Sequence, residues 1–216
     1  MKFKYIFFDV ANTLLFKPNL YEVIRETLKT FDINIDIETI KSRHIIVSEF
    51  IPSPPKTSKE FYKYFNSEYL FSLGISPKKD LINKIYENLK ALSWQQYSDV
   101  GAIDDISLPK GIISNWDSTL TQKLNDIIKS TFTHVIFSEN QGVNKPDHEI
   151  FRKAVLVSGY KNTEILFVGN SIKLDIIPAT EIGMKAVLID RDNFYPYFIG
   201  TRIDSLYKLT EVIANI

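Results

Sequence analysis

Several side chains that can do chemistry stand directly after short apolar runs in this sequence. Asp9 follows the first run, and an aspartate in such a place can act as a nucleophile toward phosphorus or carbon, forming a covalent intermediate. The alternative is an ordinary turn or helix-cap aspartate, because such carboxylates are common at the start of polar turns. Taken alone, the segment around Asp9 does not decide between these roles.

Three further polar groups repeat the arrangement. Ser114 and Asn115 follow the second run, where a hydroxyl and an amide can bind phosphoryl oxygens, although a helix cap is the commoner role. Lys145 precedes an expected helix, where an ammonium can pair with both a nucleophile and a phosphate, although most lysines are simply solvated. Asn170 and Asp175 follow the fourth run and offer oxygen ligands of the kind that Mg²⁺ prefers.

The apolar runs themselves predict a sheet. They show no period-two alternation, which is typical of strands buried on both faces of a parallel sheet; the runs are Tyr5–Phe8, Gly111–Ile113, His134–Phe137, Ile165–Val168 and Ala186–Ile189. Segments of helical spacing such as Asp147–Ser158 lie between them, so the pattern favours an α/β, doubly wound, Rossmann-like parallel sheet. Ligands bind such sheets at the carboxyl ends of the strands, where the polar groups above fall.

One stretch departs from this alternation. Residues 17–92 contain no convincing buried strand but have helical patterning, with helices expected over Tyr21–Phe31, Ile37–Phe50, Lys59–Leu73 and Lys78–Leu92. The sequence therefore predicts an all-helical subdomain inserted after the first strand, between two core segments at 1–16 and 93–216. The aromatic-rich part of the insert, Glu60–Phe71, is expected to form its core.

Composition excludes several classes of protein. The 216 residues include 26 basic and 26 acidic side chains, so nothing indicates binding to nucleic acid or to an anionic membrane. The absence of cysteine excludes disulfides, thiolate metal sites and a catalytic thiol. No apolar stretch reaches the about 18 residues of a spanning helix, and the first residues lack a signal-cleavage pattern, so a cytoplasmic location is expected.

The joint order of the polar groups resembles the four signature motifs of the haloacid dehalogenase (HAD) superfamily. FFDVANTLL resembles motif I, GIISN motif II, the lysine of GVNKPDHEIF motif III, and FVGNSIKLD motif IV, while the insert is similar to a type-1 helical cap of subfamily I. Ser-Asn-Trp-Asp at 114–117, the Lys-Pro-Asp at 145–147 and the missing second aspartate of motif I look most like the REG-2-like, HDHD3-like branch.

The resemblance implies a role for each motif residue. Asp9 would be the nucleophile, with Lys145 as the second catalytic residue. The substrate would be contacted by Asn12, Thr13, Ser114, Asn115 and Lys145, and the metal would be Mg²⁺, held by Asp9, the main-chain carbonyl of Ala11, Asn170 and Asp175.

Two departures from the superfamily pattern bear on activity. Ala11 replaces the aspartate that protonates the leaving group and later activates water, a contribution of about 10²- to 10⁴-fold in acid–base catalysis. Asn170 replaces the usual motif IV aspartate. With Asp9, Asp175, Lys145 and Mg²⁺ the formal charges leave one positive charge, so we expect weaker metal binding but undiminished attraction for phosphate.

The leading hypothesis is a Mg²⁺-dependent phosphohydrolase or phosphotransferase acting on a small phosphorylated metabolite. Its rival from another class is a HAD fold kept as a binding or regulatory module. A phosphonatase-like enzyme is a minor alternative, because Lys41-x-x-His44 faintly resembles the cap lysine motif of phosphonoacetaldehyde hydrolase. A dehalogenase is another, since those enzymes also lack the second aspartate. Substrate identity and oligomeric state stay open.

Overall fold

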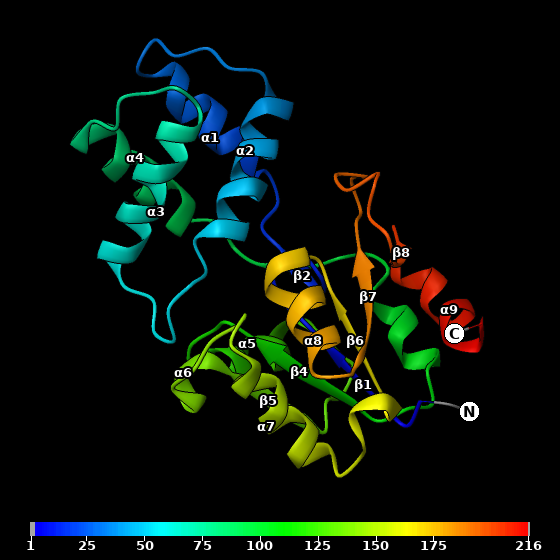
Figure 1. Ribbon diagram of the computed structural model, residues 1–216. Coiled ribbons are helices and arrows are strands. Elements are labelled where there is room, and N and C mark those ends of the chain that lie inside the picture. The colour runs from blue at the N-terminus through cyan, green and yellow to red at the C-terminus, as the bar shows by residue number, and fades with distance from the viewer. Residues whose placement is uncertain (1–2, 216) are drawn as a thin grey trace. The chain divides into compact units, whose positions relative to one another are not determined.

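The computed structural model describes residues 3–215, which include a six-stranded parallel sheet (Figure 1). The strand order is β5-β4-β1-β6-β7-β8, with bounds β1 Tyr5–Phe8, β4 Lys110–Ser114, β5 His134–Phe137, β6 Ile165–Gly169, β7 Lys185–Ile189 and β8 Thr201–Ile203. The predicted α/β, Rossmann-like fold class is confirmed. The five apolar runs became the first five of these strands in chain order, whereas the short edge strand β8 was not predicted.

The sheet order explains where a ligand site can form. β1 pairs with β4 on one side and with β6 on the other. The next strands of the sheet in sequence, β4 and β5, lie on one side of β1, and β6, β7 and β8 lie on the other. Such a reversal opens a crevice at the carboxyl ends of the strands, because the connections on its two sides diverge. The loops that follow β1, β4 and β6 therefore meet at one edge.

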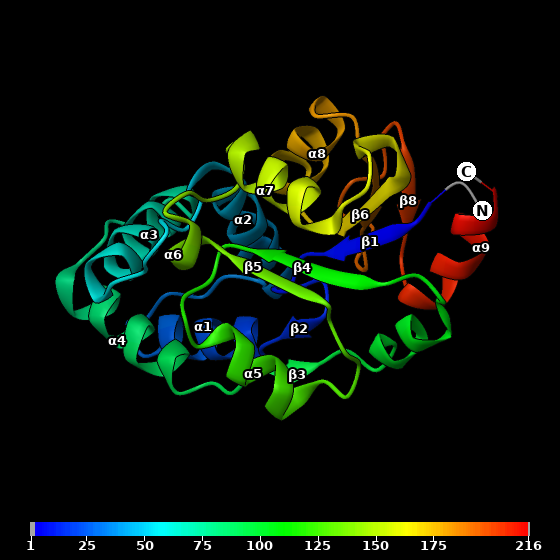
Figure 2. The same ribbon diagram turned by 90° about the horizontal axis from the view of Figure 1, so that it is seen from below.

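Helices cover both faces of the sheet, as a doubly wound fold requires. Figure 2 shows α7 (His148–Ser158) and α8 (Ile177–Glu181) on one face and α5 (Leu120–Ile127) on the other. The Phe151 ring of α7 packs edge-to-face on Phe167 of β6, with centroids 5.4 Å apart. The remaining helices of this part are α6 (Ser138–Gln141) and α9 (Leu209–Asn215).

The chain divides into two compact units, each described here by itself. The core unit comprises residues 1–16, 52–56 and 96–216, and the helical unit comprises residues 17–51 and 57–95. The segment Pro52–Lys56, from within the predicted insert, packs with the core unit: the Asn144 amide donates to the Ser53 carbonyl at 3.0 Å. Two short strands, β2 (Leu15–Phe16) and β3 (Gln95–Gln96), form a separate two-stranded sheet.

The helical unit consists of four helices whose ends are set locally. They are α1 (Leu20–Lys29), α2 (Ile37–Phe50), α3 (Lys59–Ser72) and α4 (Lys79–Lys90), all within two residues of the predicted bounds. The Asp36 carboxylate caps α2 by accepting from the Thr39 amide, and the Ser58 hydroxyl caps α3 in the same way. Within residues 3–215, no helix has the length and apolar character needed to span a bilayer.

Candidate active site

The chain makes a tight turn immediately after β1, and this turn presents Asp9. The Asp9 amide donates to the Val168 carbonyl of the neighbouring strand at 2.9 Å, which fixes the start of the turn. The Val10 carbonyl then accepts from three amides, those of Thr13, Leu14 and Leu15. Asn12 takes a left-handed conformation with φ 63°, which asparagine tolerates better than most residues. The turn is thus held by main-chain hydrogen bonds that leave the Asp9 carboxylate available.

A buried lysine bridges the two aspartates of the predicted site. The Lys145 ammonium lies 2.6 Å from Asp9 Oδ1 and 2.6 Å from Asp175 Oδ1, and all three side chains are less than a tenth exposed. Burial alone would lower the pKa of Lys145, but the Asp175 and Asp9 carboxylates outweigh it and raise that pKa. The lysine therefore stays charged and holds both carboxylates at one point.

Asp175 is placed by a turn of unusual helix. It lies in a π-helical turn, Ile172–Ile176, and its Oδ2 accepts from the Ser171 amide at 3.0 Å. Gly169, the last residue of β6, passes so close that a Cβ there would overlap the Asp175 carboxylate. Burial raises the pKa of Asp175 and repulsion from the Asp9 carboxylate adds to this, which outweighs the lowering effect of the Lys145 ammonium.

The Thr13 hydroxyl links motif I to motif IV. It lies 3.1 Å from Asp9 Oδ2 and 3.2 Å from Asn170 Oδ1, and the Thr13 side chain is fully buried. With one proton to donate, it is shared between these two oxygens. In this structure the Thr13 hydroxyl therefore holds the Asp9 carboxylate, and its predicted contact with substrate stays a prediction.

Ser114 and Asn115 end β4 on the same edge but differ in what they do. Ser114 is buried at the strand end. The Asn115 amide is engaged at both ends with the main chain of Lys145: its Nδ2 donates to the Lys145 carbonyl at 2.9 Å, and its Oδ1 accepts from the Lys145 amide at 2.7 Å. In this structure Asn115 fixes the lysine loop, and its predicted contact with substrate stays a prediction.

The structure brings five of the predicted residues together, namely Asp9, Thr13, Lys145, Asn170 and Asp175. Ala11 is partly exposed and Asn12 is exposed in the turn beside them. Sequence reasoning missed Gly169 and Ser171, which hold the Asp175 carboxylate in place. The glycine at the end of the fourth apolar run was the available signal, since an isolated glycine in a strand often marks a close approach.

The residues present fit a magnesium ion. The Asp9 and Asp175 carboxylates both contact the Lys145 ammonium, so they lie close together. The Thr13 hydroxyl lies within hydrogen-bond distance of both Asp9 and the Asn170 amide oxygen. Nowhere in residues 3–215 do three or more His, Cys, Asp or Glu side chains gather as a metal cluster. Two carboxylates supplemented by neutral oxygens match Mg²⁺, which usually retains waters and takes few protein carboxylates.

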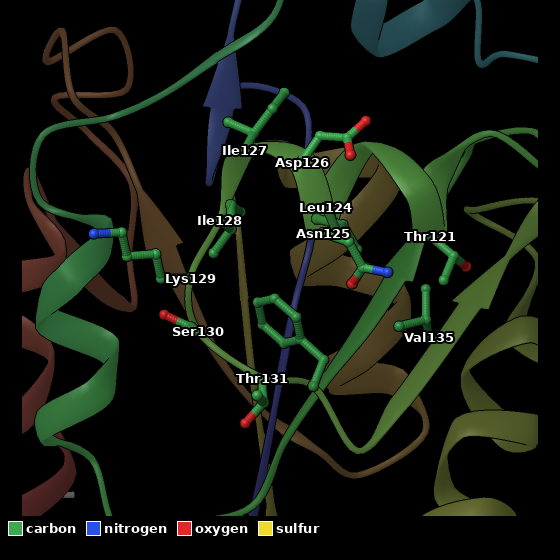
Figure 3. Close-up of a pocket in the computed structure, with 11 residues that line it drawn as sticks. Thr121, Leu124, Asn125, Asp126, Ile127, Ile128, Lys129, Ser130, Thr131 and Val135 are labelled. Atoms are coloured by element: carbon green, nitrogen blue, oxygen red, sulfur yellow. The ribbon is translucent and has the colours of Figure 1, made fainter.

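A pocket of about 550 Å³ lies elsewhere in the core unit. It is formed by α5, the loop after it and Val135 of β5 (Figure 3), and it shares no residue with the predicted site. The lining mixes Leu124, Ile128 and Phe132 with hydroxyl and amide groups. Volume alone does not locate chemistry, so the charged cluster at the carboxyl ends of the strands is the better candidate.

Comparison with known proteins supplies the class. Residues 6–189 match the sequence profile of the haloacid dehalogenase-like hydrolase family, and the chain belongs to that family. Glyceraldehyde 3-phosphate phosphatase of Pyrococcus furiosus is 27% identical over 236 residues, covering 99% of this chain and 94% of the relative. The Rhythmically expressed gene 2 protein of Drosophila melanogaster is 31% identical over 118 residues, covering 49% of this chain and 45% of the relative, as the predicted branch requires.

Solved structures agree on the fold. The HAD-hydrolase YfnB from Bacillus subtilis, in a form bound to magnesium, superposes with a TM-score of 0.72 at 19% identity and covers the whole of both chains. The protein is therefore a hydrolase of the HAD family, with relatives that are named as phosphatases.

Proposed function

We propose that this protein is a Mg²⁺-dependent phosphohydrolase or phosphotransferase that acts on a small phosphorylated metabolite through an aspartyl-phosphate on Asp9. The observation that carries the proposal is the buried Lys145 ammonium, 2.6 Å from both Asp9 and Asp175. Two buried carboxylates held by one cation are costly to maintain. A binding site for an anionic substrate and a metal ion accounts for this cost, because the ammonium attracts the phosphate and the carboxylates can ligate the metal.

The proposed reaction begins with attack on the phosphoryl group. An Asp9 oxygen forms a bond to phosphorus while the bond to the leaving oxygen breaks, and that oxygen takes a proton from water. The Lys145 ammonium and the Ser114 hydroxyl stabilise the charge on the transferring group. Water then attacks the phosphorus, releases phosphate and restores the Asp9 carboxylate.

The metal would be held by the protein at the same edge. Asp9, Asp175, Asn170 and the main-chain carbonyl of Ala11 are the proposed ligands, and bound Mg²⁺ supplies charge neutralisation for the phosphoryl oxygens. The closeness of two carboxylates and an amide oxygen, together with the likeness to a protein solved with magnesium, supports this choice.

Ala11 is expected to make the reaction slow or selective. It offers no carboxyl group to protonate a leaving alkoxide or to activate water, a loss of about 10²- to 10⁴-fold. Substrates whose leaving group departs without a proton should therefore react best, and the aspartyl-phosphate should persist.

The substrate class follows from the relatives. Several relatives are named glyceraldehyde 3-phosphate phosphatases, and four of them align over 85% or more of this chain, which supports a short phosphorylated sugar or aldehyde as the substrate. We propose that the helical unit acts as the cap that selects it. A zero formal net charge fits a small-molecule substrate better than nucleic acid.

The test compares the wild type with Asp9→Asn in phosphate release from glyceraldehyde 3-phosphate, an acyl phosphate and an aryl phosphate. We expect Mg²⁺-dependent release that the variant reduces by about 10³-fold or more, because the nucleophile is lost. A substitution at an exposed aspartate of the helical unit, Asp80→Asn, is the matched control and should leave the rate unchanged. Equal background rates for wild type and Asp9→Asn would favour a binding module instead.

A further inference from the structure

A second ion pair of the core unit is formed by the partly buried Arg191 and the buried Asp99. Arg191 follows β7, and its guanidinium binds the Asp99 carboxylate through two hydrogen bonds, Nη1 to Oδ2 at 2.7 Å and Nη2 to Oδ1 at 3.0 Å. The side chains are 15% and 4% exposed. The guanidinium also stacks on the Tyr97 ring, 3.8 Å from its centroid. A planar group held on two sides and one face has little freedom left.

Asp99 is itself fixed from the opposite direction. Its Oδ2 accepts from the Ser205 hydroxyl and from the Leu206 amide, each at 2.8 Å. The carboxylate therefore anchors Arg191 to the chain that follows β8. Because Ser205 and Leu206 hold the Asp99 carboxylate in place, the carboxylate in turn restricts where the Arg191 guanidinium can lie.

The third contact of Arg191 leads to the nucleophile. Its Nη2 donates to the Thr13 carbonyl at 2.9 Å, and the hydroxyl of the same Thr13 lies 3.1 Å from Asp9 Oδ2. The adjoining Leu14 carbonyl accepts from the Tyr97 amide at 3.0 Å. Arg191 and Tyr97 thus hold two consecutive peptides of the turn that carries Asp9.

Stability alone is a weak explanation for this arginine. Its Nε is buried without a hydrogen-bond partner among residues 3–215, and such a donor lowers stability. Arg191 accepts that cost while its two other nitrogens reach Asp99 and Thr13. A lysine could pair with Asp99 but could not span both acceptors and the Tyr97 face, because its ammonium is a single point.

We propose that Arg191 is a positioning residue of the reaction, holding the Thr13 peptide so that the Thr13 hydroxyl keeps the Asp9 carboxylate aligned for attack. The inference rests on the proposed function of Asp9. It assigns the sequence segment Asp190-Arg191, directly after the fifth apolar run, a part in the site that the motifs do not show.

The experiment compares Arg191→Lys and Arg191→Ala with Arg202→Lys. Arg202 of β8 is the matched control, since its guanidinium donates to Asp190 at 2.9 Å and to Asn193 and the Tyr195 carbonyl, which lie outside the turn at 10–15. We expect Arg191→Lys to lower kcat by about 10- to 100-fold with KM within about twofold, because misplacement by about 1 Å can cost 10²-fold. Guanidinium added to Arg191→Ala should restore part of kcat, and Arg202→Lys should keep wild-type kcat.

A second readout does not depend on turnover. Amide hydrogen exchange in the turn at 10–15 should be faster in Arg191→Lys than in Arg202→Lys at equal global stability. Wild-type kcat or unchanged exchange in Arg191→Lys would overturn the inference while leaving the proposed function intact. A wild type without Asp9-dependent phosphate release would overturn the proposed function and this inference together.

Discussion

The core unit contains a buried charge cluster, whereas the ion pairs of the helical unit lie at or near its surface. In the core, Lys145, Asp9 and Asp175 are 3%, 7% and 1% exposed. In the helical unit, the pair Lys59–Glu87 joins α3 to α4 with side chains 48% and 56% exposed. Desolvation makes the first arrangement costly and the second nearly neutral. The difference shows that packing stabilises the helical unit, while the core maintains a charge cluster that packing alone would not select.

The interior of the helical unit is apolar, in contrast to the charged cluster of the core unit. Its buried residues are mostly aliphatic, so the expectation that the aromatic stretch Glu60–Phe71 forms this core was largely wrong: Tyr62, Tyr64 and Phe71 are exposed. Tyr69 is buried, and its hydroxyl donates to the Ile40 carbonyl at 2.9 Å. His44, predicted to lie at the surface or half-buried without a metal, is half-buried among the rings of Tyr21, Phe65 and Tyr69. Burial lowers the pKa of His44 to about 4, so this ring stays neutral at pH 7.

The largest effect is expected when one lysine of an ion pair is removed from each unit and the two losses of stability are compared. Lys145→Met leaves two buried carboxylates facing each other, and we expect it to destabilise the protein by about 3–5 kcal/mol. Lys59→Met removes an exposed pair and should change the free energy of unfolding far less. Urea unfolding at pH 7 without Mg²⁺ measures both. Similar losses in the two variants would contradict the claim that the units differ.

A smaller effect is expected where the backbone approaches Asp175. Gly169→Ala places a Cβ against the Asp175 carboxylate, so the carboxylate must move or the strand must shift, at about 1–3 kcal/mol. Affinity for Mg²⁺ should fall with it. Gly101→Ala is the control, because nothing lies within 4 Å of its Cβ position and its φ is ordinary. Calorimetric Mg²⁺ titration and thermal unfolding test the pair, and an unchanged Mg²⁺ affinity in Gly169→Ala would remove Asp175 from the metal site.

The smallest effect concerns pH and the helical unit. His44 binds a proton near pH 6.5 when unfolded but only near pH 4 when folded, so its contribution to stability is complete above pH 6.5 and is lost as the pH falls toward 4. Discounted for partial exposure, the loss is about 1–2 kcal/mol. His44→Phe should lose less stability between pH 7 and pH 4 than the wild type.

Local physics explains which elements the sequence predicts. The helices α2 and α3 begin at side-chain caps, Asp36 and Ser58, so their starts are visible in the sequence. The strands β1 and β5 are continuous apolar runs and were predicted residue by residue. The edge strand β8 is three residues long and is recognised only by its pairing with β7, which no local pattern announces.

Contacts between distant residues explain what the sequence does not show. The motif residues could be assembled from their order, since each follows a strand of one sheet. Their partners could not be read in this way: Asn115 binds the main chain of Lys145, and Arg191 reaches Thr13 across most of the chain. Such pairings depend on the register of strands that are far apart in sequence. The position of Arg191 after the fifth run was a usable signal.

In the proposed reaction Asp9 carries a phosphoryl group between the two steps, and this intermediate persists because Ala11 provides no general base. The direct measurement is to incubate the protein with a labelled acyl phosphate and Mg²⁺, quench it, and follow label on Asp9 over time. We predict near-stoichiometric label that decays about 10²- to 10⁴-fold more slowly than in Ala11→Asp, and none in Asp9→Asn. Label in Asp9→Asn, or equal decay in wild type and Ala11→Asp, would contradict the account.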